Sequence, residues 1–330
     1  MSSDASGILP AWQAELWSHF AHAIERDRVA HGLLVCGPPG VGKRLFADHM
    51  MAALLCRERS DAGEACGVCA ACRQVAAATH PDISRLVPEE PGRQIKVEQV
   101  RAFTRRLYLT PQYDSGRVGW IEPAEQLSPS AANSLLKTLE EPPPNCHILL
   151  ITNHVSALMP TIRSRCQLWR VPPPSADMAR MWFEAQEVDT AGLDADSLRT
   201  PFAVQDRRER DYDGLSRSWD DALSAVIRNR QDVSSVAEGM ARQPVDLWLD
   251  WLYRRAAALM AVALNDERDT TLPRTLLQIA HRLDPAALQP WLAQVAEAAR
   301  LAGTNADWQL VIESVLLDLK ASLKRRPATS

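Results

Sequence analysis

The chain has 330 residues, of which 46% are apolar and 24% are charged, and its formal net charge is −4. This composition is that of an ordinary globular protein with room for about two or three domains, and no apolar run reaches the ~18 residues of a membrane span. The acidic balance excludes a protein that holds nucleic acid by itself through a strong basic excess, so any such contact must be local or shared with other subunits.

The N-terminal segment, residues 1–17, lacks the basic start and apolar core of a secretory signal peptide, so we expect a cytoplasmic protein. Apolar side chains at near-helical spacing predict an amphipathic helix over residues 11–28. The run GLLVC at residues 32–36 predicts a buried strand, and a helix through Leu55 is expected after it.

The segment GPPGVGK joins this strand to this helix, which is the context of a phosphate-binding loop. Gly37, Gly40 and Gly42 allow successive backbone N–H groups to point inward, and the helix N-terminus adds partial positive charge. Lys43 would reach the outer phosphates of ATP; a tight turn without a ligand is the alternative. The next residue should be Ser or Thr, whose hydroxyl binds Mg²⁺, but it is Arg44, which cannot coordinate a metal.

Four of the seven cysteines lie in one short segment, at Cys56, Cys66, Cys69 and Cys72. Two overlapping CxxC steps and four thiolates match the closed tetrahedral shell of structural zinc, so we predict that they bind Zn²⁺. A catalytic zinc would keep an open position, and a disulfide framework is not expected in a reducing cytosol. The alternative is a set of cysteines without a metal.

The next predicted elements are a strand, an amphipathic helix and a second buried strand, over residues 83–87, 95–107 and 117–121. In a P-loop ATPase the last of these strands ends in an Asp that helps to hold Mg²⁺, and in the AAA+ class a Glu follows it and activates the attacking water. This chain has Glu122 and Pro123 there, and proline cannot be a general base. Glu125 lies just beyond, but nothing in the spacing gives it the catalytic place. The changes at residues 44 and 123 together argue against an active ATPase.

Residues 131–166 predict a helix that three prolines end, a buried strand at 147–151, and a turn with two arginines. Thr152 and Asn153 directly follow the strand, at the end where open α/β sheets bind ligands. The final hexapeptide, TIRSRC at 161–166, could by itself be a solvated basic turn.

A proline-rich link at residues 170–175 predicts the end of the first domain. We expect a P-loop α/β domain with a parallel sheet and the cysteine module over residues 1–171. A small helical lid is expected over 172–216. From Trp219 onward the pattern is helical without a site-like cluster, so we expect an all-helical domain over 217–330.

With these motifs in view, GPPGVGK, the four-cysteine module, SLLKTLEEPP and SRC, the chain resembles bacterial clamp-loader subunits of the AAA+ class over essentially its whole length. The degenerate Glu122-Pro123 step, and the chain length, favour the non-hydrolysing delta-prime type over the tau/gamma type. The resemblance implies that the helical domain is a collar that holds a ring of subunits together. It also implies tau/gamma and delta subunits as partners, in a complex that opens a sliding clamp and places it on primed DNA.

By the same resemblance, Arg165 of the SRC motif is an arginine finger aimed at ATP in a neighbouring gamma or tau subunit. Thr152 and Asn153 occupy the family's sensor position, although both could simply cap the strand. Some delta-prime sequences have lost the P-loop lysine, whereas this chain keeps Lys43, so ATP binding without hydrolysis is a hypothesis. The chain would then be no ATPase by itself but a subunit of a DNA-directed DNA polymerase holoenzyme, a nucleotidyltransferase complex.

Two other functions stay open at this point. A working ATPase of the tau/gamma type would need Thr at residue 44 and Glu at residue 123. A zinc-dependent DNA-binding module is the other, and the acidic balance and the closed four-cysteine shell speak against it.

Overall fold

The computed structural model describes residues 7–90, 92–113, 115–190, 193, 195–265, 272–281, 285–301 and 306–323. The chain divides into two compact units, Met1–Val204 and Gln205–Ser330, and each is described here by itself. The three-part division expected from the sequence stays a prediction. No helix in the described part of the chain is long and apolar enough to cross a lipid bilayer.

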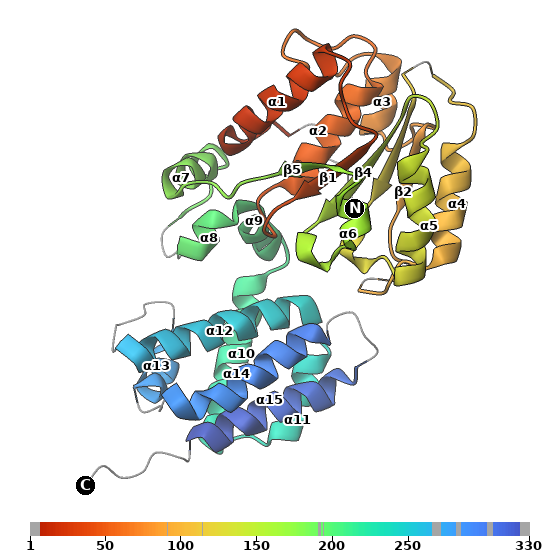
Figure 1. Cartoon of the computed structure of the whole chain (residues 1–330). Coiled ribbons are helices and arrows are strands. Elements are labelled where there is room, and N and C mark those ends of the chain that lie inside the picture. Colours follow the sequence, from red (N-terminus) through yellow and green to blue (C-terminus); the bar gives the residue numbers. More distant parts are fainter. Residues whose placement is uncertain are drawn as a thin grey trace. The chain divides into compact units, whose positions relative to one another are not determined.

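The first unit contains a parallel five-stranded sheet in the order β2-β3-β4-β1-β5 (Figure 1). Its strands are β1 (Gly32–Cys36), β2 (Ile83–Leu86), β3 (Arg117–Ile121), β4 (Cys146–Thr152) and β5 (Gln167–Arg170). In register, Cys36 lies opposite Thr152, and Ile121 lies opposite Leu150. Because all strands run the same way, the segments that follow β1, β3 and β4 come together at the carboxyl ends of the strands.

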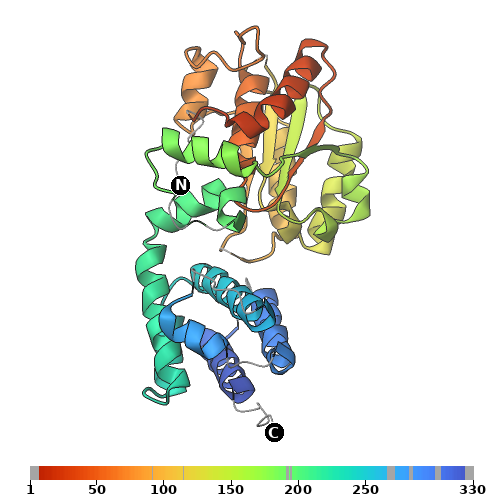
Figure 2. The same ribbon diagram turned by 90° about the vertical axis from the view of Figure 1, so that its left-hand side faces the viewer.

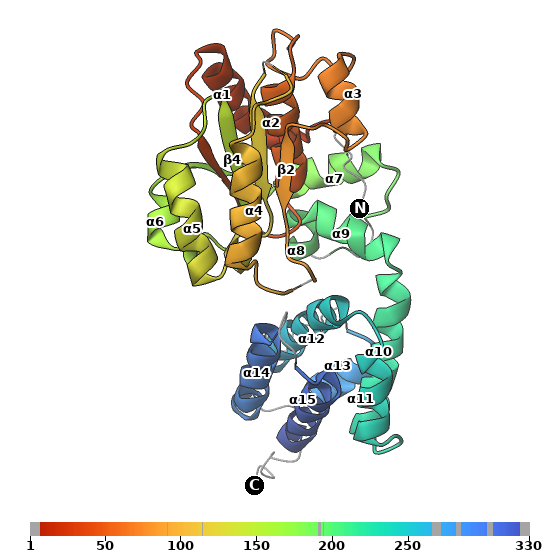
Figure 3. The ribbon, with the colours of Figure 1, turned by 90° about the vertical axis from the view of Figure 1, so that its right-hand side faces the viewer.

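Helices cover both faces of this sheet. Figure 3 shows α4 (Val97–Leu107) and α5 (Pro129–Glu140) on one side, with α1 (Ala14–Glu25) and α2 (Lys43–Leu55) on the other. Side chains of β1 alternate between two apolar clusters: Leu33 packs on the α1–α2 side, whereas Leu34 packs with α4 and α5. β1 is buried along its whole length, and a strand buried on both faces is a continuous apolar run, which is why the sequence predicted β1 clearly.

Local signals set the start and end of α5. Ser128 Oγ accepts a hydrogen bond from Ala131 N at 3.2 Å, and Pro129 occupies the first helical turn, where its missing N–H costs nothing. The remaining short elements of the first unit are η1 (Ala11–Gln13), α3 (Ala70–Ala76), η2 (Ala124–Gln126), η3 (Val155–Ala157), α6 (Pro160–Arg163), α7 (Ala176–Ala185) and α8 (Ala195–Arg199). α9 (Pro201–Glu209) spans the boundary between the units.

The described part of the second unit is helical, as Figure 2 shows. Its helices are α10 (Tyr212–Ile227), α11 (Val233–Ala241), α12 (Val245–Asn265), α13 (Arg274–Ala280), α14 (Pro285–Arg300) and α15 (Trp308–Leu323). Their core contains the buried Trp219, Trp248, Trp251 and Trp291. The predicted α/β domain with a parallel sheet, followed by a helical region, is confirmed.

Candidate functional site

The glycine loop joins β1 to α2, as the sequence predicted, and its glycines have backbone angles that other residues rarely adopt. Gly40 and Gly42 have φ angles of 76° and 88°. A Cβ at residue 42 would lie 2.6 Å from Phe202 Cε2 and 2.7 Å from Gln13 Nε2. Glycine is therefore required at this position both by the backbone and by the side chains packed on it.

Lys43 folds back over the loop that precedes it. Its side chain is buried, and Nζ donates a hydrogen bond to the carbonyl oxygen of Pro38 at 2.6 Å. Burial lowers the pKa of Lys43 to about 8, while the charge of Glu125 acts in the opposite direction. The ammonium group thus lies inside the loop, held by a backbone carbonyl, in the region where phosphate oxygens bind in loops of this type.

Arg44 pairs with Glu122 across the pocket. Arg44 Nε lies 3.6 Å from Glu122 Oε2, and the same carboxylate oxygen accepts a hydrogen bond from Trp120 Nε1 at 3.2 Å. These are the positions from which P-loop ATPases contribute a hydroxyl and a carboxylate to Mg²⁺. Here Arg44 brings a positive charge to the first position, and Glu122 at the second is already paired with it, so the residues present do not fit a bound Mg²⁺.

A pocket of about 320 Å³ opens beside these groups. It is lined by Pro39, Gly40, Gly42, Lys43, Arg44, Leu45, Glu122, Pro123, Ile151, Thr152, Asn153 and Phe202. The fold therefore brings together six of the seven residues predicted to contact nucleotide. The remaining one, Gly37, begins the loop but does not line the pocket.

Thr152, which the sequence placed just after the strand, is the last residue of β4, and Asn153 follows it; both line this pocket. Thr152 is buried, and its Oγ1 accepts a hydrogen bond from His154 N at 3.0 Å, which is the strand-end capping that the sequence left open. Asn153 is exposed, and its backbone N–H donates to Glu125 Oε1 at 3.1 Å. Their sensor role stays a prediction.

Sequence reasoning named Glu125 without giving it a place in the site, and it missed the aromatic side of the pocket. Glu125 lies in η2, where its charge acts on Lys43 and its Oε2 atom is buried without a hydrogen-bond partner. Trp12 Nε1 donates to Val41 O at 3.1 Å, and the Trp12 ring lies 6.3 Å from that of Phe202. The GxxxxGK motif gives no signal for these residues, because they come from distant segments of the chain.

Arg165 follows α6 and lies at the surface of the first unit. Its Nη2 atom is 2.5 Å from Glu140 Oε1, and its Nη1 atom donates to Thr161 O at 2.9 Å. The side chain is 34% exposed. The guanidinium is thus held by the end of α5 and by its own turn, yet solvent or another molecule can reach it.

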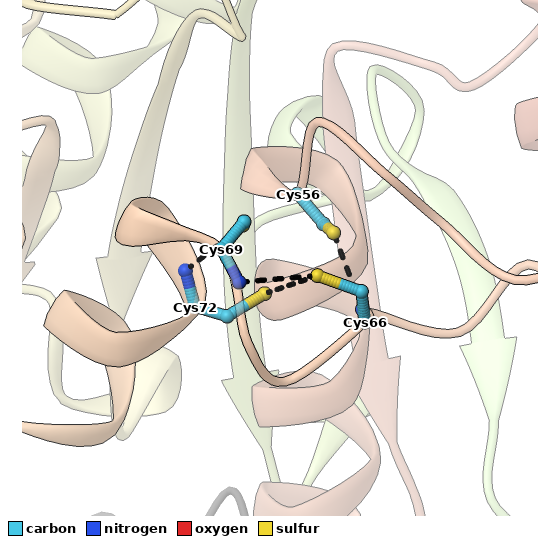
Figure 4. A group of neighbouring side chains, drawn as sticks. All are labelled: Cys56, Cys66, Cys69 and Cys72. Carbon is cyan, nitrogen blue, oxygen red and sulfur yellow. Dashed lines mark hydrogen bonds between the residues drawn. The ribbon is translucent and has the colours of Figure 1, made fainter.

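The four cysteines of the CxxC segment come together as predicted, with their sulfur atoms all within 4.8 Å of one another (Figure 4). Cys66 and Cys72 have their Sγ atoms 3.9 Å apart. Backbone N–H groups donate to the sulfurs of Cys56 and Cys66 at 3.3 Å each, as Figure 4 shows. Such donors stabilise thiolates, so this cluster could hold one metal ion. Among the described residues no histidine or carboxylate belongs to the group.

A family model and two similar proteins all connect this chain with DNA polymerase III subunits. Residues 12–175 match the family model described as "DNA polymerase III, delta subunit". The chain is 32% identical to DNA polymerase III subunit delta' of Pseudomonas aeruginosa, over 93% of this chain and 95% of that protein. It is 27% identical to the subunit of the same name from Escherichia coli strain K12, over 95% of this chain and 96% of that protein.

Two further similarities are partial or distant. The tau subunit of DNA polymerase III from Bacillus subtilis is 32% identical over 47% of this chain and 27% of that protein. A solved DNA polymerase III gamma-subunit-related protein from Thermotoga maritima is 16% identical, with a TM-score of 0.46 over 93% of this chain and 99% of that one. Since the delta' subunits of Pseudomonas aeruginosa and Escherichia coli match along nearly their whole length, the chain belongs to the delta' family of DNA polymerase III subunits, within the clamp loaders.

Proposed function

We propose that this chain is a clamp-loader subunit that does not hydrolyse ATP and that supplies Arg165 to ATP bound by a neighbouring tau or gamma subunit. The observation that carries the first half of this proposal is the ion pair between Arg44 and Glu122, 3.6 Å apart. It places a cation and its counter-ion where a hydrolysing subunit holds Mg²⁺. The tau/gamma alternative is not favoured, because Pro123 also lacks the carboxylate that activates water.

The role of Arg165 is supported by its accessibility and its chemistry. A guanidinium supplied from a neighbouring subunit neutralises charge that develops on the γ-phosphate, an effect worth on the order of 10³–10⁵ in rate. The exposed pair with Glu140 can be exchanged for a phosphate at little cost, since exposed ion pairs contribute about 0–1 kcal/mol. A chain whose own pocket is catalytically silent can therefore still take part in hydrolysis.

The pocket of the chain itself is proposed to bind ATP without turnover. Lys43, the loop amides and Asn153 lie around a space of about 320 Å³, and Phe202 offers an aromatic ring beside the loop. These groups can bind phosphates and a ring system, but they provide neither a general base nor a metal hydroxyl.

The cysteine cluster is proposed to bind Zn²⁺ through Cys56, Cys66, Cys69 and Cys72. Four sulfurs within 4.8 Å of one another match a closed tetrahedral shell, which leaves no position for substrate. The metal would connect the end of α2 to α3 and stabilise the segment between them.

The proposed partners are the tau/gamma and delta subunits, the sliding clamp, and primed DNA through the assembled complex. Reconstitution tests this directly. The isolated chain should show no steady-state ATPase activity with or without primed DNA, whereas a complex of tau and delta should load clamps only when this chain is added. Turnover by the isolated chain would favour the tau/gamma type, and clamp loading that is indifferent to this chain would contradict the proposal.

A further inference from the structure

Arg44 is the residue that most changes the chemistry of the pocket. It follows Lys43 at the first turn of α2, and its guanidinium lies 3.6 Å from the carboxylate of Glu122. The Arg44 side chain is 42% exposed and lines the same pocket as Lys43 and Asn153. A positive charge at this place faces the space in which phosphates would lie.

The carboxylates near this cation have contacts of their own. Glu122 is held by Arg44 and by Trp120 Nε1. Glu125 accepts the backbone N–H of Asn153 through Oε1, whereas its Oε2 atom is buried without a hydrogen-bond partner, and Glu125 does not line the pocket. Asp48, one helical turn after Arg44, is buried and lies 3.5 Å from Arg85 Nη2. Among the described residues that line this pocket, Glu122 is the one carboxylate, and its pairing with Arg44 leaves it poorly placed to hold a divalent cation.

The same groups suit a polyphosphate that carries no metal. Magnesium ordinarily neutralises phosphate charge and is itself held by a hydroxyl and a carboxylate. In this pocket a guanidinium takes that place, and its planar set of N–H donors matches phosphate oxygens in pairs. Lys43 Nζ can donate to a phosphate oxygen in place of the carbonyl oxygen of Pro38, because a hydrogen bond to a charged oxygen is the stronger of the two.

We propose that the pocket binds a nucleoside triphosphate without a divalent cation, with Arg44 contacting the phosphates in the place of the metal. This rests on the proposed nucleotide binding, and it extends that function by naming the form of the ligand. It also explains why Arg44 stands where the motif has Ser or Thr. The arginine removes the hydroxyl that would bind the metal, and it supplies the positive charge that the metal would have provided.

The test is a calorimetric titration of the 330-residue chain with ATP, carried out once in excess Mg²⁺ and once in EDTA. The two dissociation constants should agree within about threefold. Lys43→Ala should weaken binding by at least about tenfold in both conditions, which places the ligand at the glycine loop.

Arg44→Thr is the decisive variant, because it removes the guanidinium and restores the hydroxyl. Its affinity for ATP should be at least about tenfold weaker in EDTA than in Mg²⁺. Arg180→Thr is the matched control: this arginine on α7 is exposed and pairs with Asp177, so its loss should leave both constants unchanged. Circular dichroism would show that each variant is folded.

Three results would overturn the proposal: binding by the unmodified chain that needs Mg²⁺, an Arg44→Thr variant that is equally indifferent to the metal, or no binding at millimolar ATP. The last would also remove ATP binding from the proposed function. None of them bears on Arg165, which is judged by hydrolysis in the assembled complex, so the failures of the two proposals are distinguishable.

Discussion

Arg165 Nη2 lies 2.5 Å from Glu140 Oε1, so the arginine proposed to act on another subunit's ATP is paired with the last residue of α5 in its own chain. The Arg165 side chain is 34% exposed and the Glu140 side chain is 48% exposed. The pair orients the guanidinium near the surface without burying it. Such pairs contribute little to stability, so a phosphate can displace the carboxylate.

We therefore expect Glu140→Gln to leave the free energy of unfolding within about 1 kcal/mol of that of the unmodified chain, since only an exposed pair is lost. Urea denaturation followed by circular dichroism measures this. Arg165→Ala should fall in the same range. If either variant lost several kcal/mol in free energy of unfolding, the ion pair would be needed for folding, and Arg165 would not be available to a neighbouring subunit.

Asp82 presents the opposite case, a buried carboxylate whose role is structural. It lies 3.1 Å from Arg117 Nη2 and accepts hydrogen bonds from the backbone N–H groups of Gln112, at 2.9 Å, and Tyr113, at 3.0 Å. Asp82→Ala would leave the buried guanidinium unpaired, so we expect a loss of about 3–5 kcal/mol in urea denaturation.

Glu90→Ala is the control for this prediction, because Glu90 and its partner Arg93 are exposed. Its effect should stay within about 0.5 kcal/mol. If the two variants were equally stable, the Asp82 network would not be holding the loop before β3.

Asp48 should make stability depend on pH. Burial raises the pKa of its carboxyl to about 6, against the charges of Arg85 and Arg44, which lower it. Between the unfolded value near 4 and this folded value, the folded state binds the extra proton, so stability falls as pH rises through this window. The loss is on the order of 2 to 3 kcal/mol.

Asp48→Asn removes this titration while an amide oxygen can still accept from Arg85. The variant should therefore gain stability relative to the unmodified chain as pH rises from about 4 to 7. Urea denaturation at several pH values measures the difference. A constant difference across that range would show that Asp48 titrates normally in the folded chain.

The cysteine cluster should make the first unit sensitive to zinc removal. A strong chelator should lower the melting temperature by more than about 5 °C, because metal binding is coupled to folding. Cys69→Ser should already melt lower and respond weakly to the chelator. Cys166→Ala, outside the cluster, should respond like the unmodified chain. An unaltered melting curve in chelator would count against a structural metal.

Elements with strong local signals were predictable from the sequence. The strands GLLVC and RVGWI have the bounds that their apolar runs indicated, because both are buried on both faces. β5 (Gln167–Arg170) was missed, since it lies at the sheet edge and buries only Trp169. α3 was missed because seven residues inside the cysteine segment are too few for a periodic pattern.

The site was predictable as a motif but not as an electrostatic arrangement. The glycine loop and the substitution at Arg44 are visible in the sequence, and they indicated a weakened metal site. The pairing of Arg44 with Glu122 depends on the strand order and on side-chain directions, which no local pattern encodes. The same holds for Phe202, which reaches the loop from α9, and for Glu140, whose carboxylate meets Arg165 only once α5 and α6 are packed.

The most direct test of the account is the rate of ATP hydrolysis in a complex reconstituted from this chain, tau and delta, measured for Arg165→Ala. We expect assembly and ATP binding to be unchanged, and hydrolysis at the neighbouring site to fall on the order of 10³-fold. Arg165→Lys should be similarly impaired, because an ammonium lacks the forked donors of a guanidinium. Arg163→Ala, on the same exposed turn, should hydrolyse ATP normally. Normal hydrolysis by the assembled Arg165→Ala complex would contradict the account.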